Sequence, residues 1–298
     1  MDNYKFIVNP IAGGGKAKKL VPVIERVFKD CGVEYDIYWT RGRGDGIEAA
    51  REATEKGFKV VVAAGGDGTV NEVLNGIVGT KAVLAAVHGG KGNDFATAMG
   101  MPRDIESACR ALIEGNTRAV DLGRVMDRYF INSVGIGFDA SVAERANNGI
   151  KMFRGVSAYI YAFLQELLSY SSVEALIDTG NGPLKSKPLL VAVGIGQAYG
   201  GGMKIVPDAI QDDGLFDVCV FDDSMNRLEL VYHFPKVFFG KLKYVKQISM
   251  YRTAEVIIHF SKPRSLHMEG EIFYGDSMHF TIEPRGMTVL TGDKTADV

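Results

Sequence analysis

The chain has 298 residues, enough for two domains, and its 46% hydrophobic and 23% charged residues are typical of a globular protein. A net charge of −2 gives no electrostatic basis for binding nucleic acid. The three cysteines are isolated in the sequence, which argues against a disulfide scaffold or a zinc site and fits a reducing, cytoplasmic compartment. The first residues lead directly into a predicted strand, so we expect no signal peptide. No apolar stretch reaches the roughly 20 residues of a membrane-spanning helix.

The first part of the sequence alternates between apolar, β-branched runs and stretches with apolar residues at helical spacing. The runs predict strands at residues 4–8, 33–39, 58–62 and 82–87. The helical spacing predicts helices at residues 20–28, 47–56, 70–78 and 104–114. Strands that alternate with helices are typical of a parallel sheet, so we expect an α/β domain here.

Glycine-rich loops follow three of these strands, at residues 9–16, 65–69 and 88–96. The carboxyl ends of parallel strands lie at one edge of the sheet, where open α/β folds bind ligands. Glycine allows a sharp turn that exposes backbone N–H groups, and the N-terminus of the following helix attracts anions. Asp67 and Asp94 would repel phosphate alone, so the loops predict a site for nucleotide phosphates with a divalent cation. Glycines selected for packing alone are the alternative.

Short β candidates dominate the sequence after about residue 118, and few helices separate them. They lie at residues 118–123, 128–134, 188–194, 215–221, 254–260 and 278–282. Helical spacing recurs at residues 153–169 and 225–239. The sequence therefore predicts an α/β domain at residues 1–125 and a mainly antiparallel β domain with helical insertions at residues 126–298. This division leaves open that the last residues of the chain belong to the first domain.

Three stretches of the second half suit a functional site. One is residues 135–140, a turn of small residues with a single acid, Asp139. Residues 208–217 hold four aspartates, and such clustering favours a hard cation, although a solvated turn explains it equally well. Glu269-Gly270-Glu271 places two acids across a glycine in a β region. A hairpin there would hold one carboxylate forward as a general base, and an exposed hairpin tip is the simpler alternative.

Five motifs of the chain occur together, in the same order, in a known family. They are Asn9-Pro10 with the glycines after it, Gly65-Gly66-Asp67-Gly68-Thr69 with Asn71-Glu72, Gly92-Asn93-Asp94-Phe95-Ala96, Asp213-Gly214 and Glu269-Gly270-Glu271. Together they resemble the catalytic domain of diacylglycerol kinases, and more closely the bacterial soluble lipid kinases of that family, which include relatives of the sphingosine kinases. The resemblance implies a parallel sheet like that of NAD kinases and phosphofructokinases, followed by a β-sandwich.

The resemblance also implies ATP- and Mg²⁺-dependent phosphorylation of a lipid hydroxyl, such as that of diacylglycerol, at an active site between the two domains. Glu271 matches the acid that accepts the proton of the substrate hydroxyl. Asp67 would help to place magnesium with the phosphates, and Asp94 with Asn93 would orient the site. A structural magnesium is implied at Asp213, with the carbonyl oxygens of Ile210 and Leu215 as further ligands.

The nucleotide contacts that the resemblance implies come from the glycine loops and from one threonine after the second strand. They are Asn9, Pro10, Ile11, Ala12, Gly13, Thr40, Gly65, Gly66, Asp67, Gly68, Thr69, Val70, Asn71, Glu72 and Asn93. Phosphoryl transfer also needs positive charge near the phosphates, for which Lys16 and Lys91 are candidates. Three residues depart from the family's pattern: Glu269 stands where Asp is usual, Lys91 where Thr or Ser is usual, and His88 where Pro is common.

The predicted partners are a lipid substrate and the surface of a membrane. Residues 234–246 interleave aromatic residues with four lysines, which suits peripheral contact with an anionic membrane. An amphipathic helix packed on the core, with a solvated charged side, is the alternative. Two other functions stay open: a kinase for a soluble nucleotide, like NAD kinase, and a non-catalytic nucleotide-binding regulator. The sequence is compatible with a monomer or a homodimer.

Overall fold

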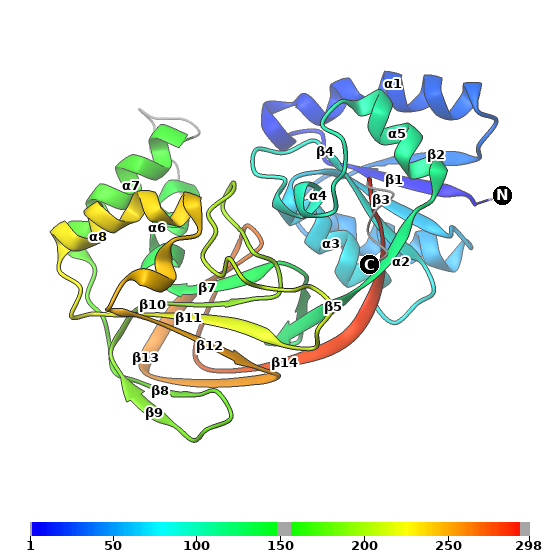
Figure 1. Cartoon of the computed structure of the whole chain (residues 1–298). Coiled ribbons are helices and arrows are strands. Elements are labelled where there is room, and N and C mark those ends of the chain that lie inside the picture. Colours follow the sequence, from blue (N-terminus) through cyan, green and yellow to red (C-terminus); the bar gives the residue numbers. More distant parts are fainter. Residues whose placement is uncertain (1, 148–155, 293–298) are drawn as a thin grey trace. The chain divides into compact units, whose positions relative to one another are not determined.

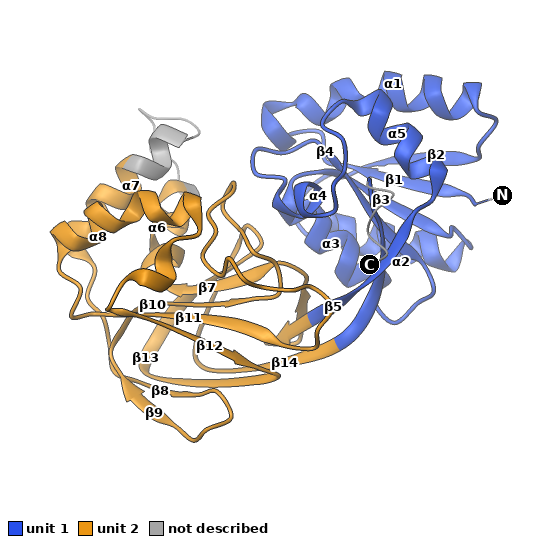
Figure 2. Cartoon of the chain, in the orientation of Figure 1, with its two compact units in different colours: residues 1–122, 284–298 blue, residues 123–283 orange. Residues whose placement is uncertain are grey.

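The computed structural model describes residues 2–147 and 156–292. The chain forms two compact units, the first of residues 1–122 with 284–298 and the second of residues 123–283 (Figures 1 and 2). The chain leaves unit 1 within strand β5 (Thr117–Val125) and returns to it within strand β14 (Glu271–Leu290). Continuous strands, rather than polar linkers, therefore connect the two units.

Unit 1 contains a parallel sheet with the strand order β2-β1-β3-β4. Its strands are β1 (Tyr4–Val8), β2 (Tyr35–Trp39), β3 (Val60–Gly65) and β4 (Val83–His88). The C-terminal end of β14 adds to this sheet beside β4, where Val289 pairs with Leu84. Strands β1 and β3 are wholly buried because helices cover both faces, so they read as continuous apolar runs.

The helices of unit 1 lie on both faces of its sheet. They are α1 (Lys16–Asp30), α2 (Asp45–Glu55), α3 (Asp67–Ile77), the short α4 (Asp94–Ala98) and α5 (Ile105–Glu114), with a 3-10 turn, η1 (Ala12–Gly14), before α1. Helices α1 and α5 pack on one face and α2 and α3 on the other (Figure 1). Phe28 of α1 meets Tyr4 and Phe6 edge-on, with ring centroids 5.1 and 5.0 Å apart, which anchors that helix to β1.

Unit 2 is built around antiparallel strands in the order β12-β11-β10-β7-β13-β14. The strands are β6 (Arg128–Phe130), β7 (Ser133–Gly137), β8 (Ala175–Asp178), β9 (Leu184–Ser186), β10 (Pro188–Gly194), β11 (Phe216–Asp222), β12 (Ile248–Thr253) and β13 (Glu255–Met268). The first half of β13 pairs with β8 and its last residues pair with β7, on either side of a register shift between His259 and Arg264. This break lets the sheet bend into two layers.

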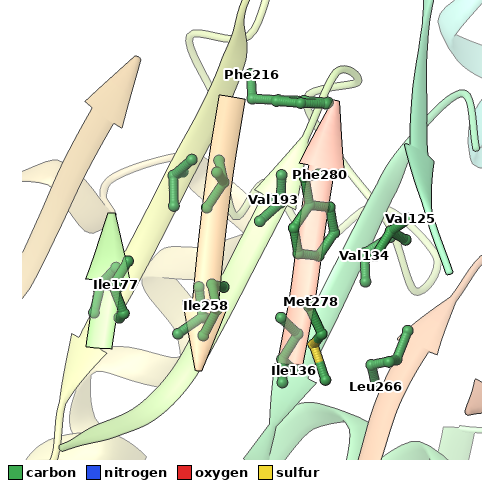
Figure 3. Close-up of a cluster of buried hydrophobic side chains, with 14 of the residues drawn as sticks. Val125, Val134, Ile136, Ile177, Val193, Phe216, Ile258, Leu266, Met278 and Phe280 are labelled. Atoms are coloured by element: carbon green, nitrogen blue, oxygen red, sulfur yellow. The ribbon is translucent and has the colours of Figure 1, made fainter. Parts of the chain in front are cut away.

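The strands of unit 2 bury both of their faces. In β10, Val191 and Val193 point into the core between the two layers, and Leu190 and Ala192 point the opposite way. Figure 3 shows the inner core, where aromatic and branched side chains such as Phe280 gather from several strands. The outer cluster lies beneath the helical elements α6 (Phe138–Asn147), α7 (Val156–Ser169), α8 (Arg227–His233), η2 (Phe234–Phe239) and η3 (Leu242–Tyr244).

The fold class predicted from the sequence is confirmed, but several element boundaries were wrong. The strand expected at residues 128–134 is two strands, β6 and β7. The helix expected at residues 225–239 is α8 followed by the 3-10 helix η2, because Pro235 has no N–H to continue an α-helix. Part of the helix expected at residues 153–169 lies outside the described residues, and α7 covers the rest. No helix among the described residues is long and apolar enough to cross a bilayer.

Candidate functional site

The edge of the unit 1 sheet contains a topological switch point. From β1 the chain crosses to β2 on one side and continues to β3 on the other, so the strand order reverses between β1 and β3. In open α/β sheets the crevice at such a point is the usual ligand site. The loops that follow β1 and β3 are two of the three glycine loops predicted to bind phosphates, so the topology brings them together.

The three glycine loops touch one another through backbone atoms. A Cβ on Gly13 would lie 2.6 Å from the carbonyl oxygen of Gly89, and one on Gly90 would lie 2.3 Å from Cα of Gly66. The N–H of Gly89 also donates to the carbonyl of Gly65 at 3.1 Å. These glycines allow the loops to approach one another closely, which is the packing role given above as the alternative to ligand binding. That requirement does not compete with ligand binding, because the same contacts fix the positions of Asp67 and Asp94.

Asp67 is the first residue of α3, and its carboxylate faces the start of α4. Oδ1 of Asp67 accepts a hydrogen bond from the N–H of Phe95 at 3.1 Å. Burial, and secondarily the nearby carboxylate of Asp94, raise the pKa of Asp67, although the backbone N–H groups of Phe95 and Asn93 oppose the shift. Two carboxylates that disfavour each other's charge fit a divalent cation, which would complete its coordination with water and phosphate oxygens.

Asn93 fixes the third loop from within. Its backbone lies in the left-handed region with φ of 58°, a conformation that asparagine tolerates better than most residues. Oδ1 accepts a hydrogen bond from the N–H of Gly90 at 2.7 Å, and Nδ2 donates to the carbonyl of Gly90 at 3.1 Å. The side chain predicted to help orient the site therefore closes the loop on itself, directly before Asp94.

Glu72 of α3 holds the loop after β2. Its two carboxylate oxygens accept hydrogen bonds from the N–H groups of Gly44 and Gly46, at 2.8 and 2.9 Å. Gly46 lies in the first turn of α2, so Glu72 satisfies donors at the N-terminus of that helix. In this structure the predicted nucleotide contact Glu72 ties α3 to α2, and its role toward a nucleotide stays a prediction.

Asn9 and Thr40 stand at the ends of β1 and β2. Nδ2 of Asn9 donates to Oγ1 of Thr69 at 3.4 Å, and Oδ1 accepts from the N–H of Ile11 at 3.2 Å, so Asn9 joins the first two glycine loops. Thr40 is buried, and its N–H donates to the carbonyl of Val8 at 2.9 Å. Both residues therefore lie at the carboxyl edge of the sheet, as the sequence predicted.

Most of the other predicted contacts fall into two groups by their position in unit 1. Those in the first loop and at the start of α1 are Pro10, Ile11, Ala12, Gly13 and Lys16. Those at the end of β3 and in α3 are Gly65, Gly66, Gly68, Thr69, Val70 and Asn71, of which Gly65, Thr69, Val70 and Asn71 are buried. Lys16 and Lys91 are exposed at the edge of the sheet. His88 contacts the carbonyl of Met101 through Nε2 at 2.8 Å.

In unit 2 the predicted base, Glu271, follows a two-residue hairpin turn. Met268 of β13 pairs with Glu271 of β14, and the turn residues Glu269 and Gly270 both have positive φ, at 47° and 99°. This is the pattern of a type I′ turn, whose twist matches that of the flanking strands. The carboxylate of Glu271 therefore lies at the start of a strand, next to a turn of fixed shape, and its residue is partly exposed.

Glu269 is buried, and its carboxylate anchors the turn. Oε1 accepts hydrogen bonds from the backbone N–H groups of Ile131 and Asn132, at 2.7 and 2.6 Å, in the connection between β6 and β7. The acid that departs from the family's usual Asp thus makes a structural contact with the sheet. The extra methylene of Glu lets the carboxylate reach these donors while Glu271 keeps its place one residue after the turn.

His267 supports the same turn from β13. Its Nε2 accepts a hydrogen bond from the N–H of Gly270 at 3.1 Å, which requires a neutral ring with the proton on Nδ1. Burial lowers the pKa of His267 from 6.5 to about 4, so the ring stays neutral near pH 7. Sequence reasoning missed this residue because the bond depends on the shape of the turn.

A buried acid lies behind the hairpin. Oδ2 of Asp139, at the start of α6, accepts a hydrogen bond from the hydroxyl of Tyr199 at 2.5 Å. Burial raises the pKa of Asp139 to about 6. A Cβ on Gly135 would lie 1.8 Å from Oδ2 of Asp139, so this glycine makes room for the carboxylate. The ring of Tyr199 lies 6.2 Å from that of His267, centroid to centroid, which connects the buried pair to the turn.

An arginine of the neighbouring strand β12 contacts the acidic turn that was predicted to hold a structural magnesium. Asp213 accepts the N–H of Leu215 at 3.0 Å and forms an ion pair with Arg252, whose Nε also lies 3.5 Å from Asp217. Arg252 is opposite Asp217 in the pairing of β11 with β12. Within residues 2–147 and 156–292 no group of three or more His, Cys, Asp or Glu side chains could hold a metal. The metal role of Asp213, Ile210 and Leu215 stays a prediction.

Comparisons with known proteins agree with this architecture. Residues 3–125 match the model of the diacylglycerol kinase catalytic domain, and residues 132–291 match that of the YegS C-terminal NAD kinase beta sandwich-like domain. A diacylglycerol kinase of Bacillus subtilis is 30% identical over 274 residues, which cover 91% of this chain and 90% of the relative. One of Staphylococcus carnosus is 30% identical over 254 residues, covering 81% and 83%.

The fold also matches solved structures. A crystal structure of a diacylglycerol kinase from Bacillus anthracis has a TM-score of 0.74 at 22% identity and covers 100% of this chain and 98% of that one. The match to the diacylglycerol kinase catalytic domain and the relatives named diacylglycerol kinase identify the chain as a lipid kinase. The chain belongs to the diacylglycerol kinase family.

Proposed function

We propose that this lipid kinase transfers the terminal phosphoryl group of ATP to the free hydroxyl of diacylglycerol. The observation that carries the proposal is the meeting of three glycine loops, with Asp67 and Asp94, at the switch point of the unit 1 sheet. Backbone N–H groups and a helix N-terminus at that edge suit phosphates, and the paired acids suit the magnesium that accompanies them. The relatives at 30% identity are named diacylglycerol kinases, which supports this choice of lipid.

The residues of unit 1 bind and orient the phosphates. Asn9, Thr69 and Asn93 hold the loops in place through the hydrogen bonds described above, and Lys16 and Lys91 add positive charge near them. Bound Mg²⁺ would neutralise charge on the transferring group. Asp67 and Asp94 are the residues that would hold it, because their carboxylates are the pair that the loops bring together.

Glu271 of unit 2 accepts the proton in this proposal. The hydroxyl oxygen of diacylglycerol forms a bond to the terminal phosphorus, the bond from that phosphorus to the bridging oxygen of ATP breaks, and ADP leaves. The hydroxyl proton passes to the Glu271 carboxylate. A base within reach of the reacting hydroxyl typically contributes about 10²–10⁴-fold. The type I′ turn and the buried Glu269 fix the backbone from which the Glu271 side chain extends.

The proposed substrate is a membrane lipid, so we also propose that the protein acts in the cytoplasm as a peripheral protein on a membrane surface. The membrane contact is supported by the lysines and aromatic residues of residues 234–246.

Incubation of the purified protein with labelled ATP, Mg²⁺ and mixed micelles of diacylglycerol tests the function. We expect labelled phosphatidic acid on thin-layer chromatography. Parallel reactions with sphingosine and with NAD test the other substrate classes. Label in NADP instead of lipid would identify a nucleotide kinase, and ATP binding without transfer to any substrate would identify a nucleotide-binding regulator.

The variant Glu271→Gln tests the base. We expect kcat to fall by about 10²–10⁴-fold with an unchanged melting temperature, because the amide keeps the shape but accepts no proton. Asp276→Asn is the matched control, since Asp276 is an exposed acid on the same strand. Full activity of Glu271→Gln would remove Glu271 from this role.

A further inference from the structure

Part of the helical surface of unit 2 carries large apolar side chains that face solvent. The exposed ones are Leu164 and Leu168 of α7, Leu228, Val231 and Tyr232 of α8, Phe238 and Phe239 of η2, and Tyr244 of η3. Leu228 is 82% exposed and Phe239 is 73% exposed, so these are not partly covered core residues. We call this set, together with the basic residues named below, the docking face.

The elements of the docking face are joined to one another. Arg227 at the start of α8 donates from Nη2 to the carbonyl of Leu168 at 2.9 Å, and the rings of Phe163 and Phe234 lie 4.6 Å apart. Leu164 and Leu168 are four residues apart in α7, so they share one side of that helix. Figure 1 shows α7 and α8 beside each other on the same side of the unit 2 strands.

Other residues of α8, η2 and η3 pack into the core, so the exposed side chains are not part of it. Leu230, Val237, Leu242 and Val245 are buried in the cluster beneath the helices. The sequence analysis gave a segment packed on the core as the alternative to membrane contact, and about half of the apolar residues do pack there. The other half, including Phe239 and Tyr244, points outward.

The segment that carries most of these apolar side chains is basic. Between residues 225 and 246 the basic side chains are Arg227, Lys236, Lys241, Lys243 and Lys246, and the acid is Glu229. Glu229 completes a capping box with Asn226 at the start of α8, and Lys243 pairs with Asp208. A strongly basic segment in a chain of net charge −2 is a local feature that attracts an anionic surface.

A hollow adjoins the same surface. It has a volume of about 600 Å³ and lies between the C-terminal end of α7 and the start of α8. Apolar side chains such as Leu167 and Leu189 line it together with charged and polar ones, among them Glu166, Lys187 and Asp223.

We propose that the docking face inserts Leu228, Tyr232, Phe239 and Tyr244 into the interface of an anionic lipid bilayer, while Lys236, Lys241 and Lys246 contact the lipid headgroups. Apolar and aromatic residues beside lysines are the composition that such an interface selects. The inference rests on the proposed function in one respect: a substrate that is a bilayer lipid explains why the protein would bind a bilayer.

Co-sedimentation with vesicles tests the docking face without ATP. Wild-type protein is expected to bind vesicles of equal parts phosphatidylglycerol and phosphatidylcholine, and to bind vesicles of phosphatidylcholine alone at least about tenfold more weakly. The double variant Leu228→Ser/Phe239→Ser and the double variant Lys241→Glu/Lys246→Glu are each expected to lose at least about tenfold in binding to the anionic vesicles.

Matched controls change the same residue types elsewhere on unit 2. Leu176→Ser/Leu184→Ser removes two exposed leucines, and Lys185→Glu/Lys262→Glu reverses two exposed lysines. Both control variants are expected to bind like the wild type. Equal binding by all variants, or equal binding of neutral and anionic vesicles, would overturn the proposal.

Activity assays separate this proposal from the proposed function. The docking-face variants are expected to keep wild-type rates on diacylglycerol in detergent micelles and to lose at least about tenfold on anionic vesicles. Vesicle binding without phosphorylation of any lipid contradicts the kinase proposal alone. Sedimentation velocity tests whether the docking face binds a second copy of the chain instead of a bilayer. If the wild type is a dimer that Leu228→Ser/Phe239→Ser converts into a monomer, and vesicle binding is unchanged, the docking proposal is also overturned.

Discussion

At the scale of single residues, Glu269 illustrates how the hairpin of unit 2 is held. Its buried carboxylate accepts two backbone N–H groups, from Ile131 and Asn132, while its own backbone has positive φ. Bonds from N–H donors to a carboxylate are charge-assisted and therefore stronger than neutral ones. The neighbouring Glu271 begins β14 directly after the turn, so the anchored Glu269 sets the backbone position from which Glu271 extends.

Replacement of Glu269 is expected to affect both stability and turnover. Glu269→Ala leaves two buried donors without their acceptor and should lower the free energy of unfolding by about 2–5 kcal/mol. Glu269→Gln keeps an acceptor but loses the charge, so its loss should be smaller, with a lower kcat and little change in KM. Urea denaturation and steady-state kinetics measure the two effects. Glu283→Ala, an exposed acid on β14, is the control. An unchanged stability of Glu269→Ala would contradict the anchoring role.

The ion pair of Arg252 with Asp213 predicts how the protein's stability depends on the metal expected at Asp213. Because its guanidinium already neutralises Asp213 and lies close to Asp217, removal of divalent cations should leave the melting temperature unchanged. Arg252→Met should lower the free energy of unfolding by at most about 1 kcal/mol, because solvent screens the partly exposed pair, and make the melting temperature rise with added Mg²⁺. Thermal unfolding with and without EDTA measures this, in an Asp67→Asn background that removes one of the two proposed magnesium ligands at the glycine loops. A fall in the melting temperature of that background protein with EDTA would instead support the structural metal.

At the scale of elements, the glycine loops form a single assembly. Gly90 and Gly66 approach so closely that any side chain on Gly90 must displace the β3–α3 loop, which carries Asp67. Gly90→Ala should therefore lower the free energy of unfolding by about 1–3 kcal/mol and weaken ATP binding, as overpacking does. Gly42→Ala is a matched control, because its added Cβ would meet no atom within 4 Å. Equal stability and ATP affinity of the two variants would show that the loops adapt independently.

His267 beside the hairpin turn and Asp139 at the start of α6 make the stability of the protein depend on pH in opposite directions. The folded His267 has a pKa of about 4 against an ordinary 6.5, so the unfolded chain binds more protons between these values and stability falls as pH falls through them. Asp139, with a pKa of about 6, holds its proton longer in the folded state, so its contribution falls as pH rises from about 4 to 6.

Variants of the two residues separate the opposing contributions. Between pH 6.5 and 4.5, His267→Gln should lose less stability than the wild type, because glutamine still accepts the Gly270 N–H but does not titrate. Asp139→Asn should lose more, because the contribution of His267 is then unopposed. Denaturant unfolding at several pH values measures both slopes, and a shared slope for all three proteins would show that neither group titrates as described.

The sequence predicted those elements whose signal is local. The apolar runs of β1, β3 and β4 and the glycine loops after them were correctly placed, because burial on both faces and sharp turns leave a mark within a few residues. Helix α4 and strand β9 are too short for a periodic signal, and β14 is much longer than its apolar stretch at residues 278–282. Its remaining residues are strand because β13 pairs with them, and such pairing depends on residues distant in the sequence.

The same limit applies to the candidate site. The motifs indicated Asp67, Asp94 and Glu271, but not that Glu72 ties α3 to α2 or that Glu269 anchors a turn. His267 and Tyr199 carry no motif at all, because each acts through a partner that the fold brings near, Gly270 and Asp139 respectively. Long-range hydrogen bonds of this kind have no spacing that a single sequence reveals.

At the scale of the whole molecule, the two units are one continuous chain joined by strands. The fully buried Asp121 of β5 accepts a hydrogen bond from the N–H of Arg285 at 2.7 Å, where β14 has re-entered unit 1 and Arg285 has φ of 51°. Both crossing strands are thus fastened to each other on the unit 1 side. Removing either crossing strand would take a structural element from both units, so each unit depends on the complete chain.

The last prediction concerns the contributions of both units to one reaction. If Asp67 of unit 1 and Glu271 of unit 2 serve the same phosphoryl transfer, their loss should not be multiplicative, because groups that act together in a step give non-additive effects. Asp67→Asn and Glu271→Gln are each expected to lower kcat by about 10²–10⁴-fold, and the double variant should lie within about tenfold of the weaker single variant. Initial rates on diacylglycerol micelles at saturating ATP measure all four proteins, with melting temperatures as the check on folding. A double variant whose loss is the product of the single losses would mean that the two acids contribute to separate steps.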